Sequence, residues 1–153
     1  MDEIGDASLQ TQSKLLRVLE EGTFKRVGGT KNIKVDVRII SSTNRDLTAL
    51  IEQKKFREDL FFRLNAFTIF LPPLRQRKED IPLLVDHFLK SNNDIEKRKF
   101  KLSSSAMDIL NSYHWPGNVR ELQNVIRYAV NMSADNYIMP NSLPNFLFTP
   151  GQT

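Results

Sequence analysis

Apolar residues recur every three or four positions in four stretches of the chain, and this spacing is typical of amphipathic helices. The first stretch ends at Gly22, a residue type common just beyond a helix. The other three begin near Asp80, Ser103 or Ser104, and Asn118, whose side chains can cap a helix. With two shorter helices, the predicted helical ranges are 8–21, 47–54, 56–64, 80–90, 103–114 and 118–133.

Strand patterns occur only in the first half of the chain. Residues 23–27 and 33–38 flank Gly28-Gly29, which can supply the positive φ angles of a tight hairpin. Ile39-Ile40 then prolongs the second strand into an apolar run that ends at the polar residues 41–44, so a buried parallel strand with its carboxyl edge there is predicted over about 37–43. Ligands usually bind at that edge.

A second buried strand is predicted over 66–71, where Pro72-Pro73 stops it. No strand pattern recurs from Leu74 onward. We therefore expect an α/β part over 1–73, an all-helical part over 74–147 and a tail over 148–153.

Composition narrows the possible classes of protein. The 153 residues are 40% hydrophobic and 26% charged, a globular composition, and the net charge of +4 is too small to indicate a partner. There is no cysteine, and two histidines alone cannot build a zinc centre. No apolar run approaches the roughly 20 residues of a membrane span, so we expect a cytoplasmic protein.

Arg57 and Arg63 lie six residues apart in an apolar helical stretch. Six helical steps turn about 240° beyond a full rotation, so the two side chains point in different directions. This arrangement favours two distinct anionic targets, one of which could lie on another subunit. The alternative is local pairing with Glu58 or Asp59 on a solvated helix.

Four long stretches resemble the AAA+ domain of sigma-54-dependent transcriptional activators of the NtrC type. They are 115–122 (WPGNVREL), 56–64 (FREDLFFRL), 42–47 (STNRDL) and 71–81 (LPPLRQRKEDI), and they occur in the family's order. The resemblance covers 1–147 and implies an incomplete AAA+ P-loop NTPase core, with a partial parallel sheet and a hairpin, followed by an all-α lid.

The resemblance also implies roles for individual residues. Asp2 and Glu3 match the end of the Walker B motif, in which the aspartate holds Mg²⁺ and the glutamate orients the attacking water. Asn44 matches sensor 1, which reaches the γ-phosphate or that water. Arg57 and Arg63 match the arginine fingers, with Arg63 as the main one.

In the lid, the resemblance assigns nucleotide binding to Val119 and Arg120, and Arg120 matches sensor 2. The resemblance also counts Asp2 among the nucleotide-binding residues, as the ligand of Mg²⁺ in the intact domain. The other reading of Arg120 is a surface arginine that pairs with Glu121 or Asn124.

Two family motifs do not occur in the chain. The sequence contains no Gly-Lys pair and hence no G-x-x-x-x-G-K-[ST] loop, and it lacks the G-A-F-T-G-A loop that contacts the sigma factor. We therefore expect the C-terminal part of a motor whose parent binds ATP and Mg²⁺, forms a ring and remodels sigma-54 RNA polymerase. The parent would contact DNA through a separate domain, and the 153 residues alone would be inactive and bind neither ligand.

Two other functions remain open. One is a nucleic-acid-binding module that uses the basic run 97–101 and the face of the last helix that carries Arg120 and Arg127. The other is a catalytically silent chain that only assembles with others. For the fold, we expect an independent lid and core strands that pair with each other or with a second copy.

Overall fold

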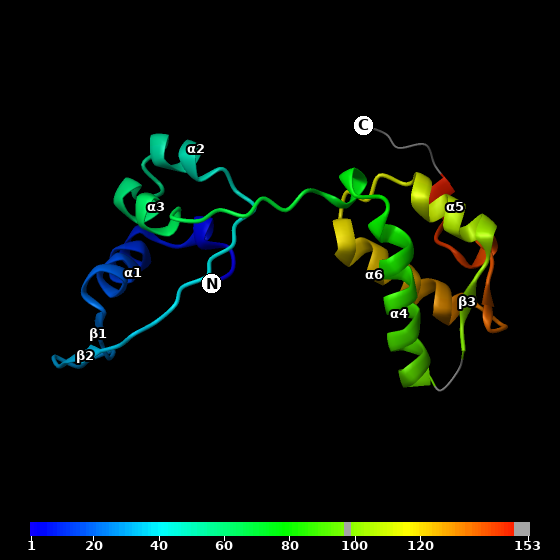
Figure 1. Cartoon of the computed structure of the whole chain (residues 1–153), viewed down its shortest axis with the longest axis horizontal. Coiled ribbons are helices and arrows are strands. Elements are labelled where there is room, and N and C mark those ends of the chain that lie inside the picture. The colour runs from blue at the N-terminus through cyan, green and yellow to red at the C-terminus, as the bar shows by residue number, and fades with distance from the viewer. Residues whose placement is uncertain (97–98, 149–153) are drawn as a thin grey trace. The chain divides into compact units, whose positions relative to one another are not determined.

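The computed structural model describes residues 1–96 and 99–148. The chain divides into two compact units, residues 1–69 and residues 70–153 (Figure 1). Among the described residues, no helix has both the length and the apolar character needed to cross a bilayer.

The first unit is built around helix α1, Leu9–Glu21, whose ends match the sequence pattern. Ser8 caps it by accepting a hydrogen bond from the Thr11 amide at 3.2 Å, and Gly22 ends it in the left-handed conformation with φ 60°. The unit's other elements are η1 (Ile4–Asp6), β1 (Thr23–Lys25), β2 (Asn32–Lys34), α2 (Leu47–Glu52) and α3 (Glu58–Leu64).

Strands β1 and β2 form the predicted antiparallel hairpin, with Phe24 opposite Ile33. Both strands are shorter than predicted. Of the two central glycines, Gly28 has a positive φ, 74°. The hairpin lies beyond the C-terminal end of α1, as the labels in Figure 1 show.

The two predicted core strands do not form. Residues 37–43 and 66–71 are extended, but among the described residues neither belongs to a sheet, and no hydrogen bond joins them. Ile40 is 72% exposed and Phe67 84% exposed, so both predictions of a buried strand were wrong. The reason is that apolar composition alone makes no strand, since an extended chain also needs neighbours for its backbone groups. Of the two arrangements expected for these segments, direct pairing with each other is absent, and completion by a second copy stays a prediction.

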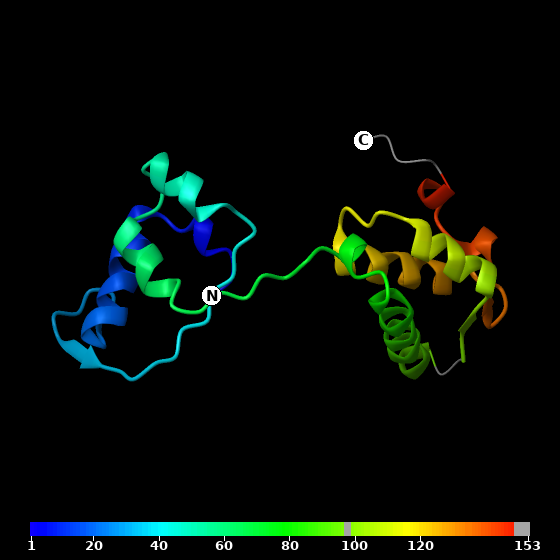
Figure 2. The ribbon, with the colours of Figure 1, turned by 45° about the horizontal axis from the view of Figure 1, so that its top comes forward.

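The second unit is helical apart from one short parallel pair. Its helices are α4 (Asp80–Glu96), α5 (Ser104–Ser112) and α6 (Asn118–Met132), with short turns η2 (Leu74–Gln76), η3 (Pro140–Ser142) and η4 (Asn145–Phe148). Helix α4 packs against α6 and also contacts α5 (Figure 2). The α/β class with a helical second part is confirmed, but the sequence pattern missed the parallel pairing of β3 (Lys101–Leu102) with β4 (Tyr137–Ile138).

Each unit has its own hydrophobic core. Ile4, Leu50, Phe56 and Leu60 are buried in the first unit. The core of the second unit draws on all three of its long helices and surrounds Trp115, which is fully buried. The Trp115 indole nitrogen donates to the Leu110 carbonyl at 2.9 Å, so burial leaves this polar group satisfied. The second unit therefore has a core built from its own residues.

Replacing Leu122 by alanine should destabilise the second unit by about 2–5 kcal/mol, because a fully buried side chain would leave a cavity. The matched control is Leu83→Ala, since Leu83 is 72% exposed and should change stability by no more than about 0.5 kcal/mol. Urea unfolding followed by fluorescence measures both effects, because Trp115 is the chain's one tryptophan. Equal losses in the two variants would contradict the assigned core.

Candidate functional site

The first residues of the chain run beside the segment that leads to Asn44. The Ser42 amide donates to the Met1 carbonyl at 2.9 Å, and the Ile4 amide donates to the Ser42 carbonyl at 3.0 Å. The Ser42 hydroxyl also donates to the Asp2 carboxylate at 3.0 Å. Asp2 is thereby held beside a residue that lies two positions before Asn44.

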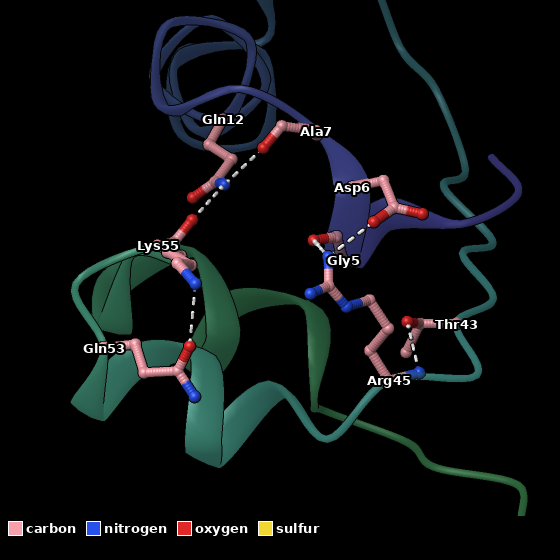
Figure 3. Close-up of polar contacts among 8 residues, drawn as sticks. All are labelled: Gly5, Asp6, Ala7, Gln12, Thr43, Arg45, Gln53 and Lys55. Carbon is pink, nitrogen blue, oxygen red and sulfur yellow. Dashed lines mark hydrogen bonds and ion pairs between the residues drawn. The ribbon is translucent and has the colours of Figure 1, made fainter.

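A second set of contacts braces the same place (Figure 3). The Arg45 guanidinium donates to the Asp6 carboxylate at 2.5 Å and to the Gly5 carbonyl at 3.4 Å. The Arg45 amide donates to the Thr43 hydroxyl at 3.1 Å. Arg45 was not predicted as a site residue, because its partner Asp6 lies 39 residues away in the sequence.

Glu3 and Asn44 present exposed side chains. Glu3 has φ 54°, in the left-handed region that few glutamates adopt, and it precedes the turn η1. Among the described residues, Asn44 has no hydrogen-bond partner, so its amide is free to meet a ligand. Just after it, Asp46 caps α2 by accepting from the Ala49 and Thr48 amides. The hydrogen bond from Ala49 and those from Thr48 lower the pKa of the Asp46 carboxyl.

The two arginines of α3 differ in how firmly they are held. Arg57 precedes the helix and donates to both oxygens of the Asp59 carboxylate, at 2.9 and 2.6 Å, and to the Ser13 hydroxyl at 3.0 Å. Arg63 makes one hydrogen bond within the described part of the chain, a 3.4 Å contact with the Leu19 carbonyl. The local pairing considered from the sequence is thus present for Arg57, while Arg63 is nearly unengaged.

Arg57 and Asp59 shift each other's pKa. Hydrogen bonds from Arg57 lower the pKa of the Asp59 carboxyl below its ordinary 3.8. Asp59 raises the pKa of Arg57, mainly through the same hydrogen bonds. Both side chains are close to half exposed, so this ion pair orients Arg57 more than it stabilises the fold.

In the second unit, the stretch 115–122 is fixed at the start of α6. Asn118 was predicted to cap this helix, and that was wrong: Gly117 is the cap residue, and its amide donates to the Glu121 carboxylate at 2.8 Å. Asn118 has φ 53° and accepts a hydrogen bond from the Leu74 amide at 2.8 Å. The asparagine therefore holds η2 against the beginning of α6.

Val119 and Arg120 lie in the first turn of α6 and differ in burial. Val119 is half-buried against the core of the second unit. Arg120 is exposed, and within 1–96 and 99–148 it pairs neither with Glu121 nor with any other residue. The surface pairing considered from the sequence is therefore absent, and the guanidinium remains available to an anion.

The basic run considered for nucleic acid is not a stacking platform. Lys97 and Arg98 lie outside the described residues. Phe100, its one aromatic residue, is 4% exposed and belongs to the core of the second unit. A ring in the core offers no face to a base, so nothing beyond charge supports this reading.

Comparisons with known proteins identify relatives of both units. Residues 1–70 match the family described as the sigma-54 interaction domain, and residues 75–153 match the AAA+ ATPase lid domain. The nitrogen fixation protein AnfA of Azotobacter vinelandii is 51% identical over 150 residues, which are 97% of this chain and 28% of AnfA. The DNA-binding transcriptional regulator NtrC of Azospirillum brasilense is 54% identical over 127 residues, 83% of this chain and 26% of that protein.

Solved structures agree with these sequence matches. NtrX from Brucella abortus in complex with ADP has a TM-score of 0.87 at 41% identity, over 98% of this chain and 35% of that one. NtrX in complex with ATP has a TM-score of 0.86 at 42% identity, over 95% and 35%. The chain thus spans about a third or less of the length of these relatives.

Replacing Arg57 by glutamine should raise the pKa of Asp59 toward its ordinary value, because the main hydrogen bonds that lower it are lost. Since the folded pKa is the lower one, the pair stabilises the fold above the ordinary pKa and loses this effect as pH falls through the folded value. Carboxyl NMR titration measures the shift. Arg17→Gln is the control, because Arg17 pairs with Glu21 and should leave Asp59 unchanged.

Proposed function

This chain belongs to the AAA+ family of sigma-54-dependent transcriptional activators, and we propose that it supplies the sensors, arginine fingers and lid of an ATP-driven motor. The observation that carries the proposal is the pairing of residues 1–4 with Ser42, which sets Asp2 and Glu3 beside the segment that ends at Asn44. An acidic pair next to a polar segment suits hydrolysis of a phosphoanhydride. The intact protein is proposed to act as a ring.

Asp2 is the proposed ligand of Mg²⁺. Within the described residues no three His, Asp or Glu side chains gather as a metal site of their own, whereas Mg²⁺ commonly takes one or two carboxylates together with substrate phosphates. The single exposed carboxylate of Asp2, already oriented by Ser42, fits that second kind of site. When bound, the ion would neutralise charge on the phosphates.

Glu3 and Asn44 are proposed to act on the nucleotide itself. The Glu3 carboxylate accepts a hydrogen bond from the attacking water and so orients this water. The Asn44 amide donates to the γ-phosphate or contacts the same water. Arg45 holds Asn44 in place through Asp6 and Gly5, so we add Arg45 to the site as a positioning residue.

Arg63 is the proposed main finger, and its freedom supports this choice. A guanidinium has five N–H donors, and Arg63 uses one of them in a long contact, whereas Arg57 uses three. Arg63 can therefore turn toward the phosphates of a neighbouring copy in the ring. Arg57 keeps two donors for an assisting role.

Arg120 is proposed to sense the nucleotide from the lid, with Val119 beside it. Arg120 stands at the start of a helix of 15 residues, where the helix dipole also favours an anion. The ADP and ATP complexes of NtrX support the proposal that the ligand is a nucleotide.

The partners follow from this role. We propose that the intact protein assembles with its own copies, remodels sigma-54 RNA polymerase in the cytoplasm and contacts DNA through a separate domain. The 153 residues contain no phosphate-binding loop, so by themselves they are proposed to hydrolyse no ATP. The 153-residue polypeptide therefore serves as the negative control in ATPase assays.

Arg63→Ala, made in a longer polypeptide that carries a phosphate-binding loop ahead of Met1, should reduce ATP turnover by about 10³-fold or more. Affinity for ATP should stay unchanged, because a finger acts mainly on the transition state. Steady-state kinetics and calorimetry measure the two quantities. A smaller effect than that of Arg57→Ala, or equal loss of binding and turnover, would contradict the assignment of Arg63 as main finger.

Arg120→Ala in the same longer polypeptide should weaken ATP binding, because it removes a positive charge from the phosphates. Arg127→Ala is the matched control, since Arg127 is also exposed on α6 but lies two turns further along the helix. Calorimetry with Mg-ATP compares the two variants. Equal affinities would exclude Arg120 as a nucleotide ligand.

A further inference from the structure

Gln12 is a polar residue with 0% exposure in the first turn of α1. A buried amide is costly unless its hydrogen-bonding groups are satisfied, and here they are. The side-chain nitrogen donates to the Ala7 carbonyl at 2.7 Å and to the Lys55 carbonyl at 3.0 Å, as Figure 3 shows. The side-chain oxygen accepts from the Arg57 amide at 2.9 Å.

These three partners determine which way the amide must point. The Ala7 and Lys55 carbonyls can only accept, and the Arg57 amide can only donate. Turning the amide over would set nitrogen against N–H and oxygen against two carbonyls, so all three bonds would be lost together. The network therefore holds a single arrangement.

The side chain of Gln12 bonds to the backbone on both sides of Phe56, just before α3 begins. Lys55 and Arg57 flank Phe56, which is 3% exposed and lies in the core of the first unit. Arg57 is the N-cap residue of α3, and no side chain caps that helix end in the usual way. The place where α3 begins is thus set by Gln12, a side chain of another helix.

The next residue of α1 holds the side chain of the same arginine. The Ser13 hydroxyl accepts a hydrogen bond from the Arg57 guanidinium at 3.0 Å. The Asp59 carboxylate accepts from another nitrogen of the same guanidinium. Two consecutive residues of α1 thereby fix first the backbone and then the guanidinium of Arg57.

We propose that Gln12 is a positioning residue for the arginine finger Arg57, and that Ser13 aligns its guanidinium. The inference rests on the proposed function of Arg57 as an assisting finger. Gln12 touches no nucleotide in this role; it acts by fixing where α3 starts and hence where Arg57 stands. A residue that only stabilised the core would change stability without changing the order of Arg57.

NMR of the 153-residue chain tests the first step. Gln12→Asn keeps an amide but shortens it by one methylene, so it cannot reach all three partners. We expect hydrogen exchange at the Arg57 amide to become faster by about tenfold or more. Gln10→Asn is the matched control, because Gln10 is exposed on the same helix and has no hydrogen bond of its side chain among the described residues.

Ser13→Ala serves as a second variant, because Ser13 is exposed and its loss should leave the fold intact. It should change the Nη1–H signals of Arg57, since Nη1 donates to Ser13, and leave the protection of the Arg57 amide unaltered. An unchanged Arg57 signal in Ser13→Ala, or unchanged amide protection in Gln12→Asn, would overturn the inference. If Gln12→Asn fails to fold, the unaltered chain decides: the side-chain amide protons of Gln12 should be protected from exchange, and rapid exchange of these protons would overturn the inference.

Turnover tests the second step, in the longer polypeptide with a phosphate-binding loop. Gln12→Asn should lower kcat by about 10²-fold with KM for ATP unchanged, because a misplaced group costs rate rather than ground-state binding. An unchanged kcat in this variant, where Arg57→Ala lowers kcat, would overturn the inference. If Arg57→Ala itself leaves kcat unaltered, it is the proposed finger role that fails, and the inference falls with it.

Discussion

The first unit depends on one buried amide. Gln12 reaches Ala7 before its own helix and Lys55 and Arg57 more than 40 residues later, so three segments share one set of hydrogen bonds. Removing water from this site makes the bonds strong and makes their loss costly. The unit's small apolar core, around Phe56 and Leu60, packs on this frame.

In the second unit, a short motif joins separate segments by hydrogen bonds and packing. Within 115–122, Trp115 fills the core, Asn118 holds the backbone of Leu74, and Glu121 satisfies the amide of Gly117. Arg120 is the member of this group that remains exposed and unpaired among the described residues. Most of the motif thus builds the platform on which one charged side chain is displayed.

The sequence predicted the helices well because their signals are local. Ser8, Gly22 and Ser103 act within a few residues of their own positions, and each lies where the pattern indicated. The strands over 37–43 and 66–71 failed because a strand depends on distant partners. Arg45 and Gln12 escaped notice for the same reason, since their partners lie 39 and 43–45 residues away. The roles of Asp2, Glu3, Asn44, Arg57, Arg63, Val119 and Arg120 rest on family resemblance.

Gly5 carries a consequence for how this chain can vary. A Cβ at Gly5 would lie 2.8 Å from the Thr43 hydroxyl, closer than real Cβ atoms approach, and 3.3 Å from the Arg45 side chain, which is a tight contact. Thr43 cannot simply turn away, because its hydroxyl accepts the hydrogen bond of the Arg45 amide. Positions 5 and 43 therefore form an epistatic pair, in which a side chain gained at one must be compensated by a smaller one at the other. Among relatives, exchange at these two positions should be correlated rather than independent.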